Sequence, residues 1–441
     1  MTPHDIHALV KEHEIRVIRI FFTDILGRLK GLNIHVDELD RALDEGINFD
    51  GSSVEGFVRI EESDLTARPD PASFRIFPFD HGGTRSALMM CDVLRADGTP
   101  QASDPRQVLA RTLDRAKAMG FDDFFVGPEL EYFYFDSSKA PIPLDEVGYF
   151  DVLPLDRTAD AREATSVALQ SMGMRVEATH HEVAPSQHEI DFRYGEAMKM
   201  ADQMMLARLV IKEVARRHGL YATFMPKPIK GENGSGMHVH QSLFKGGLNA
   251  FYDGSDAYGL SAVGRGYTAG LLDHARELTA VTNQYVNSYK RLVPGYEAPV
   301  YVSWGRRNRS TLVRVPAFKE TANGRSCRVE YRAPDPAANP YLAFAVMLGA
   351  GLDGIERELT LRPPEEANIF HMSASEKAER GISSLPGSLN EATNTAEGSA
   401  FLAEVLGADL FDKFIANKRA EWDEYRTQVT DFEIQRYLPI L

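Results

Sequence analysis

The spacing of hydrophobic and polar residues predicts that the chain begins with a small β-rich unit. Residues 16–34 contain two runs rich in β-branched and aromatic residues around a polar turn at 24–27, which is the pattern of a hairpin. Residues 37–46 predict a helix, whereas 49–57 (FDGSSVEGF) hold too many Gly and Ser residues for a helix or strand and predict a loop. A helix expected over 104–120 follows the turn sequence RADGTP, so we place a domain boundary near residue 100.

Beyond this boundary, expected helices alternate with strands, which is typical of an α+β or α/β body. A long helix is expected over 196–218, with basic residues near its negative end and Gly219 as its C-cap. Another helix is expected to begin at Asn339 and Pro340, an N-cap followed by proline at the first helical position.

Two carboxylates lie on an expected strand at 124–135 (FFVGPELEYFYF). Alternation puts Glu129 and Glu131 on the same face as Phe133 and Phe135. Like charges on an aromatic strand are unfavourable unless a cation compensates them, so one interpretation is a hard metal ion. The other is a strand end that projects into water, and this segment alone does not separate the two.

A second acidic segment, 177–194, carries Glu182 and Glu189 across a turn at 185–186, which brings the two acids toward one point. Because glutamates dominate, Mg²⁺ or Mn²⁺ suits such a site better than zinc. Three histidines of this segment are expected to form hydrogen bonds or face solvent instead of binding metal: His180, His181 and His188.

The segment 233–243 (NGSGMHVHQSL) predicts a glycine-rich turn that enters a strand with His238, His240 and Ser242 on one face. The N–H groups of such a turn suit a carboxylate or a phosphate. Glycine turns are common, so this is weak evidence alone. An imidazole beside many carboxylates nevertheless suits a metal site.

Arginines gather in the last third of the chain. Arg328, Glu330 and Arg332 alternate on an expected strand, where two guanidinium groups can clamp phosphate or carboxylate oxygens. A solvated charged strand is the alternative. Five more arginines are near in sequence: Arg306, Arg307, Arg309, Arg314 and Arg325.

Composition narrows the classes of function. The net charge of −15 argues against a nucleic-acid partner, and an anionic substrate would need local arginines or metal ions. No Gly-Lys pair occurs, which excludes a P-loop. The two distant cysteines, Cys91 and Cys327, and the absence of a long apolar run favour a soluble cytoplasmic protein without a membrane segment. The residues by themselves indicate metal-assisted phosphoryl transfer.

Seven blocks, in this order, resemble glutamine synthetase of the bacterial and archaeal type I: FDGSSVEGF, GPELEYF, HHEVAPSQHEID, NGSGMHVHQSL, NSYKRLVPGYEAP, NRS and RVEYRAPDPAANPYLAF. The resemblance covers nearly the whole chain. It implies an α+β fold, with a small β-grasp domain at 1–100 and a large glutamine synthetase/guanido kinase-like catalytic domain at 101–441, whose antiparallel sheet lines the active site. The implied activity is ATP-dependent ligation of ammonia to the γ-carboxylate of L-glutamate through γ-glutamyl phosphate.

The resemblance also implies roles for single residues. Two divalent ions, Mg²⁺ or Mn²⁺, would be held by one set of three ligands each: Glu131, Glu182 and Glu189, and Glu129, His238 and Glu330. ATP contacts would come from Glu177, Phe192, Tyr194, His240, Ser242 and Arg325, with Arg309 and Arg314 on its phosphates. The glutamate contacts would be Asn233, Gly234, Arg291 and Arg332.

The remaining implied residues concern ammonium, assembly and regulation. The ammonium pocket and its flap would be formed by Asp50, Ser53, Tyr149, Glu182 and Glu297. In the family, the residue matching Asp50 comes from the neighbouring subunit, which implies a homo-oligomer of two stacked hexamers. The segment 57–64 is similar to the alpha subgroup, in which the position of Arg59 serves feedback inhibition by glutamine. Phe370 stands at the position of the adenylylated tyrosine, so that modification is not expected.

Two other interpretations compete with glutamine synthesis. A γ-glutamyl-amine ligase on the same scaffold would take methylamine or another small amine, but the matching ammonium pocket favours ammonia. A relative without catalytic activity would be expected to lack metal ligands, whereas every expected acidic ligand and the histidine are present.

Overall fold

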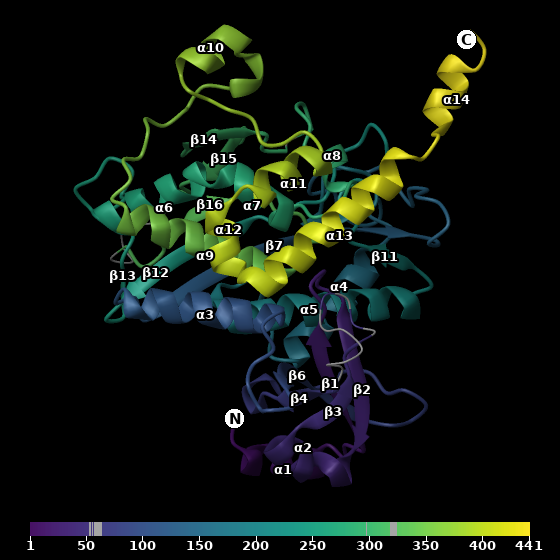
Figure 1. The fold of residues 1–441 in the computed structure, drawn as a ribbon. Coiled ribbons are helices and arrows are strands. Elements are labelled where there is room, and N and C mark those ends of the chain that lie inside the picture. The colour runs from purple at the N-terminus through teal and green to yellow at the C-terminus, as the bar shows by residue number, and fades with distance from the viewer. Residues whose placement is uncertain (53, 55, 57–63, 297, 318–323) are drawn as a thin grey trace.

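The computed structural model describes residues 1–441 apart from 53, 55, 57–63, 297 and 318–323. A small N-terminal unit lies below a much larger body that contains the C-terminus (Figure 1). The mixed α+β class expected from the sequence is confirmed. Among the described residues, no helix has both the length and the apolar character needed to cross a membrane.

The N-terminal unit is a twisted sheet with two short helices. Its strands run in the order β2-β1-β6-β4-β3, with β5 paired to β6. The β1–β2 pair is the expected hairpin, and α2 is the expected helix. The elements are α1 (Pro3–Glu12), β1 (Val17–Thr23), β2 (Leu29–His35), α2 (Leu39–Glu45), β3 (Ile47–Asp50), β4 (Asp64–Pro69), β5 (Arg75–Ile76) and β6 (Ser86–Arg95).

The loop expected over 49–57 is partly wrong. Phe49 and Asp50 belong to β3, where they pair with Leu65 and Asp64 of β4. Phe49 also stacks on Phe22, so packing against the hairpin extends the strand past the point at which Gly and Ser begin. Three positions of this segment lie outside the described residues.

The large body is built on a second sheet, ordered β14-β15-β16-β12-β7-β9-β8. Neighbouring strands on this path are antiparallel, as expected, except for the parallel pair β14–β15. Its strands are β7 (Asp123–Phe135), β8 (Val176–His181), β9 (Gln187–Phe192), β10 (Gly195–Glu196), β11 (Tyr221–Thr223), β12 (Val239–Lys245), β13 (Leu248–Asn249), β14 (Tyr301–Gly305), β15 (Thr311–Arg314) and β16 (Val329–Tyr331).

Helices surround this sheet and bury its apolar side. Three of them match the helices expected over 104–120, over 196–218 and from Asn339. They are α3 (Pro105–Ala118), α4 (Ala159–Ser171), α5 (Ala197–Arg217), α6 (Ala262–Asp273), α7 (Ala275–Thr282), α8 (Ser288–Arg291), α9 (Pro340–Glu356), α10 (Ala374–Glu379), α11 (Leu389–Glu397), α12 (Ala400–Leu406), α13 (Ala408–Arg426) and α14 (Asp431–Tyr437).

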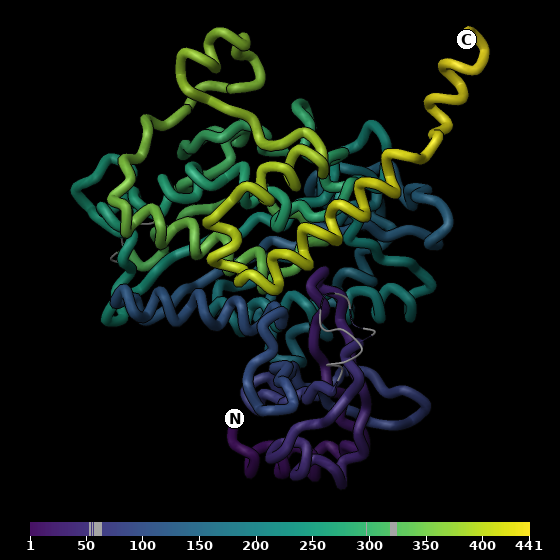
Figure 2. Tube along the Cα trace, in the orientation of Figure 1, coloured from purple at the N-terminus to yellow at the C-terminus, as the bar shows by residue number. Residues whose placement is uncertain are grey.

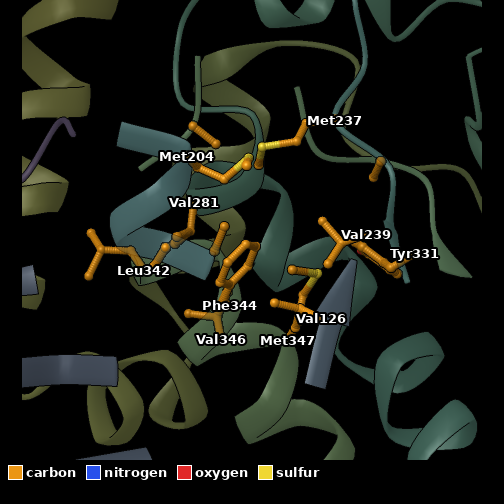
Figure 3. Packing of buried hydrophobic residues seen from close by; sticks show 14 of the residues in the cluster. Val126, Met204, Met237, Val239, Val281, Tyr331, Leu342, Phe344, Val346 and Met347 are labelled. Carbon is orange, nitrogen blue, oxygen red and sulfur yellow. The ribbon is translucent and has the colours of Figure 1, made fainter. Parts of the chain in front are cut away.

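Helix α9 is the centre of the core. It is apolar around most of its circumference, so it must be buried on all sides. Figure 3 shows Phe344 and Met347 of α9 in one cluster with Val126 of β7, Val239 of β12 and Met204 of α5. The strands that carry polar residues on their other face therefore rest on a continuous hydrophobic layer.

The start of α9 also holds the N-terminal hairpin. Asn339 caps α9 by accepting a hydrogen bond from the Tyr341 N–H, and its amide donates to the carbonyl oxygens of Asp24 and Ile25, each at 3.2 Å. The turn residue Gly27 has φ +72°, and a Cβ there would lie 2.8 Å from Asn339 Cα. The hairpin rises from the small unit into the larger body (Figure 2).

A buried arginine joins the two units electrostatically. The Arg106 guanidinium, in α3, lies 2.5 Å from Asp70, 2.6 Å from Asp92 and 3.2 Å from Asp202. Asp70 follows β4 and Asp92 is in β6, whereas Asp202 is in α5 of the large body. Burial raises the pKa of Asp202 and Arg106 counteracts that rise, so the four side chains depend on one another.

Replacement Arg106→Met is expected to destabilise the protein by about 3–5 kcal/mol, because three carboxylates would lose their shared, buried counter-charge. Thermal unfolding of the purified variant measures this loss. Arg41→Met is the matched control, since Arg41 pairs with Glu38 on the surface and its removal should cost less than about 1 kcal/mol. Equal unfolding temperatures of the two variants would show that the network around Arg106 adds nothing.

Candidate functional site

The polar face of the second sheet carries the acids. Glu129 and Glu131 project from β7, which lies between β12 and β9. On one side His240 of β12 is opposite Gly127, and on the other Glu189 of β9 is directly opposite Glu131. Cross-strand neighbours have Cβ atoms about 5 Å apart, so the register forces these carboxylates together.

One group of ligands consists of Glu129, His238 and Glu330, which offer atoms within 4.8 Å of one another. His238 Nδ1 lies 3.1 Å from Glu129 Oε2 and 3.7 Å from Glu330 Oε1. Burial, together with Arg332, lowers the pKa of His238, which favours the neutral imidazole that a metal requires. These are the three residues that the family resemblance assigns to one ion, and their donor set fits a divalent cation.

Glu330 is also paired with two arginines. It is almost fully buried, 2.5 Å from Arg314 and 3.2 Å from Arg332. Burial alone would raise the pKa of Glu330, but His240 and Arg332 nearby outweigh it and lower the pKa. Glu330 is therefore a carboxylate that stays ionised in the interior of the protein.

The second expected set, Glu131, Glu182 and Glu189, lines one cavity. Burial and the charge of Glu182 raise the pKa of Glu131 to about 8, and burial and the charge of Glu131 raise the pKa of Glu189. Carboxylates that raise one another's pKa in this way need a cation if they are to stay ionised. The residues fit a second hard divalent ion, although Glu131 lies outside the tightest groups of possible ligands.

Two further side chains border this set. His180 lies 3.6 Å from Glu189 and 3.9 Å from Glu182, and Asp191 forms a possible ligand group with Glu129 and Glu189. The sequence interpretation missed Asp191, although strand alternation from Glu189 places it on the same face.

The other two histidines of this segment are buried and hydrogen-bonded. His181 Nδ1 donates to the Glu182 carbonyl at 2.7 Å, and His188 contacts Thr158 and Arg162. Of the two alternatives expected for them, hydrogen bonding or exposure to solvent, the structure shows the first. His181 is the last residue of β8 and pairs with His188 of β9, so both lie beside the turn between these strands.

Two cavities open on the acidic face. The larger, about 1120 Å³, is lined by all six residues expected to contact the body of a nucleotide: Glu177, Phe192, Tyr194, His240, Ser242 and Arg325. Arg328 lines it too, and its Nε donates to His240 Nδ1 at 3.2 Å. Glu129 also lines this cavity and belongs to the first ligand group.

The smaller cavity, about 310 Å³, brings acids and arginines together. Besides the second set of glutamates it is lined by His238, Glu330, the ammonium-pocket residue Tyr149 and the expected glutamate contacts Asn233, Gly234, Arg291 and Arg332. Arg309 and Arg314, expected on the phosphates of ATP, line this cavity and not the larger one. Arg332 donates to the Arg309 carbonyl, which ties the two arginine-bearing segments together.

Four expected residues are not seen in these cavities. Asp50 ends β3, where its side chain accepts a hydrogen bond from the Ser52 N–H, and it lines neither cavity of its own chain. Ser53, Arg59 and Glu297 lie outside the described residues. The roles expected for all four remain predictions.

Two family models match the chain. Residues 14–96 match the model described as "Glutamine synthetase, beta-Grasp domain", and residues 102–437 match "Glutamine synthetase, catalytic domain". The chain belongs to the glutamine synthetase family. This family uses ATP and a divalent metal ion, in agreement with the acidic and arginine-lined cavities.

Named relatives extend over almost the whole chain. Glutamine synthetase of Methanosarcina mazei is 50% identical and covers 100% of this chain and 98% of the relative. Glutamine synthetase of Thermotoga maritima is 49% identical, and the match covers 99% of this chain and 100% of the relative.

Solved structures share the fold. The GmaS/ADP complex in conformation 1 has a TM-score of 0.89 at 32% identity, covering 98% of this chain and 99% of that one. The cryo-EM structure of Plasmodium falciparum glutamine synthetase has a TM-score of 0.89 at 26% identity and covers 99% of both chains.

Gly236 lies where three side chains of the site leave little room for a Cβ atom. A Cβ at Gly236 would lie 2.6 Å from Arg291 Nη2 and 3.1 Å from both Glu131 Oε1 and His238 Nε2. The Gly236 N–H donates to Glu131 Oε2 at 2.9 Å, so the turn also orients this carboxylate. An added Cβ would therefore force the Arg291 guanidinium to shift and would press on Glu131 and His238.

Gly236→Ala is expected to lower glutamine synthesis about 100-fold, because even a shift of about 1 Å in Arg291 and Glu131, which line the smaller cavity, misplaces what that cavity binds. Steady-state kinetics with glutamate, ammonia and ATP measure the loss. Gly398→Ala serves as the control, since the nearest atoms to its added Cβ are 3.8 Å away, outside both cavities. Full activity in Gly236→Ala would contradict the packing described here.

Proposed function

We propose that this glutamine synthetase forms L-glutamine from L-glutamate and ammonia, with ATP converted to ADP and phosphate. The observation that carries this assignment is the junction of the two cavities. Glu129 lines the larger cavity, His238 and Glu330 line the smaller one, and the three offer ligand atoms within 4.8 Å of one another. A nucleotide in one cavity and a carboxylate in the other would therefore meet at the same acidic cluster.

The arginines of the smaller cavity suit the two anionic substrates. Arg309 and Arg314 would hold the phosphates of ATP, and Arg291, Arg332 and the 233–234 turn would hold glutamate. Arg291 is buried and its guanidinium donates to the carbonyl oxygens of Ala333 and Pro334, so its position is fixed before a substrate arrives. Fixed charges of this kind stabilise phosphoryl transfer because they need no reorganisation during the reaction.

The chemistry then proceeds in two displacements. The γ-carboxylate oxygen of glutamate attacks the terminal phosphorus of ATP, and ADP leaves with the electron pair of the broken P–O bond. Ammonia attacks the γ-carbonyl carbon of the resulting γ-glutamyl phosphate, and phosphate leaves while one proton of the nitrogen is taken up. We propose that Mg²⁺ or Mn²⁺ binds at the two sets of ligands. These divalent ions would neutralise the negative charge of the phosphates.

Ammonium requires a separate set of groups that attract a cation and accept its proton. We assign this role to Asp50, Ser53, Tyr149, Glu182 and Glu297. Tyr149 lies edge-on against the ring of His180, and both Tyr149 and Glu182 line the smaller cavity. Exclusion of water there would protect the acyl phosphate from hydrolysis.

We further propose that Asp50 acts in the site of a neighbouring subunit, within a dodecamer of two stacked hexamers. Exposed apolar side chains support assembly: Phe150 and Val152 beside the smaller cavity's Tyr149, and Phe432 and Leu438 in and after α14. Helix α14 extends away from the rest of the body (Figure 1). The proposed division is a domain at 1–100 that donates Asp50 and a catalytic domain at 101–441.

Location and feedback control complete the proposal. Both cysteines are buried and unpaired, which agrees with the cytoplasmic location that we propose. We also propose that glutamine inhibits the enzyme through Arg59. Unchanged activity at saturating glutamine would contradict this control without affecting the assignment of the reaction.

The choice of nucleophile tests the proposed reaction against the amine-ligase alternative. Ammonium should be used with a kcat/KM at least about tenfold higher than that for methylamine, because a site shaped for ammonium gains little from an added methyl group. Product formation from each amine, with glutamate and ATP saturating, measures the ratio. A preference for methylamine would assign the chain to the γ-glutamyl-amine ligases, whose scaffold and acyl phosphate would be the same.

The position of Asp50 is tested by mixing subunits. Asp50→Ala and Glu330→Ala should each be nearly inactive, whereas co-expressed mixtures should regain roughly a quarter of wild-type activity on random assembly. Such sites would combine Glu330 of one chain with Asp50 of its neighbour. Co-expression of Glu129→Ala with Glu330→Ala is the control, because both ligands belong to one chain's cluster and no mixed site would be complete. Absence of recovery in the first mixture would place Asp50 in its own chain's site.

A further inference from the structure

A buried glutamine, Gln187, lies at the centre of the acidic cluster. It is the first residue of β9 and its exposed fraction is 0%. The pairing of β9 with β7 places Gln187 opposite Phe133 and Glu189 opposite Glu131. Because side chains alternate along a strand and diagonal neighbours remain in reach, Gln187 shares a face with both glutamates.

The side-chain amide of Gln187 connects three segments. Its Nε2 donates to Glu131 Oε2 at 2.9 Å and to the Gly234 carbonyl oxygen at 3.2 Å. Its Oε1 accepts a hydrogen bond from the Ala184 N–H at 3.2 Å. Glu131 is an expected metal ligand, Gly234 belongs to the expected glutamate-binding turn, and Ala184 lies in the turn that follows Glu182. One amide therefore connects parts of both binding functions.

The contact with Glu131 fixes the direction of its carboxylate. Oε2 receives both the Gln187 amide at 2.9 Å and the Gly236 N–H at 2.9 Å. Two donors on one carboxylate oxygen leave Oε1 as the atom that would meet a cation. Hydrogen bonds to metal-binding carboxylates typically contribute about 10- to 100-fold to metal affinity or activity.

The contact with Gly234 fixes the turn at 233–234, which lines the smaller cavity. The Gly234 backbone is already crowded, since a Cβ there would lie 2.3 Å from the Pro226 carbonyl oxygen and 3.1 Å from Arg291 Cγ. Movement of this turn would therefore displace Arg291, which the proposed function assigns to a substrate carboxylate. Gln187 limits that movement by its hydrogen bond to the Gly234 carbonyl oxygen.

We propose that Gln187 is a positioning residue that couples the metal ligand Glu131 to the glutamate-binding turn at 233–234. The inference rests on the proposed function, and it concerns the placement of binding groups. A glutamine with only a structural role would stabilise the fold without altering the affinity for either ligand. Coupling instead requires that metal affinity and the KM for glutamate change together.

Gln187→Met tests the coupling because methionine keeps the length and removes both the donor and the acceptor. Mn²⁺ binding without substrates is measured from the electron paramagnetic resonance signal of free Mn²⁺. The site formed by Glu131, Glu182 and Glu189 should bind Mn²⁺ about tenfold more weakly. The class formed by Glu129, His238 and Glu330 should keep its affinity, since Gln187 does not contact it. The KM for glutamate should rise about tenfold, while the KM for ATP should stay within about twofold.

Gln284→Met is the matched control. Gln284 is equally buried, and its amide donates to the carbonyl oxygens of Leu26 and Ala337 outside both cavities. This variant should lose stability but keep the wild-type Mn²⁺ affinity and glutamate KM. Gln187→Asn, which keeps an amide that is one methylene group too short, carries the test if Gln187→Met does not fold.

Wild-type Mn²⁺ affinity and glutamate KM in a folded Gln187 variant would overturn the inference, as would equal changes in the Gln284 control. The proposed function is checked separately by glutamine formation in the wild-type enzyme. Failure of that reaction would contradict the proposed function, whereas the Mn²⁺ comparison would still decide whether Gln187 positions Glu131.

Discussion

The structure depends on one electrostatic constraint, the gathering of carboxylates on a buried sheet face. Glu131 and Glu189 are directly opposite on β7 and β9. Burial raises the pKa of each, and the charge of Glu182 adds to the rise at Glu131 as the charge of Glu131 does at Glu189. Such a face is unfavourable unless cations or fixed donors compensate it. The surrounding structure supplies both in part, with the Gln187 amide and the Gly236 N–H on Glu131 and two arginines on Glu330.

The hydrophobic core keeps this unfavourable arrangement in place. The opposite face of the sheet packs on α9, which is buried along nearly its whole length. The cap of α9, Asn339, also binds the hairpin turn of the N-terminal unit, and Arg106 joins that unit to α5. Burial of apolar area on one side of β7 therefore offsets the cost of crowding charges on its other side. The same contacts fix the position of the N-terminal unit, in which Asp50 ends β3.

The sequence predicts this site well where local periodicity determines geometry. Alternation along β7 correctly puts Glu129 and Glu131 on one face, and the N-cap signal at Asn339 correctly starts α9. Prediction fails where a distant contact decides the outcome. Phe49 extends β3 because it stacks on Phe22. The pairing of Glu131 with Glu189 depends on strand register, which neither segment specifies alone.

Charge balance explains why arginines and acids are interleaved instead of separated. A cluster of glutamates alone would bind cations but repel ATP and glutamate, whereas arginines alone would bind these anions but exclude metal. Glu330 has His238 on one side and Arg314 and Arg332 on the other, so it belongs to both sets. The buried Glu330 carboxylate thereby holds the guanidinium groups of Arg314 and Arg332 in a fixed orientation. The short alternation of Arg328, Glu330 and Arg332 around β16 thus places the boundary between the larger and the smaller cavity on a single strand.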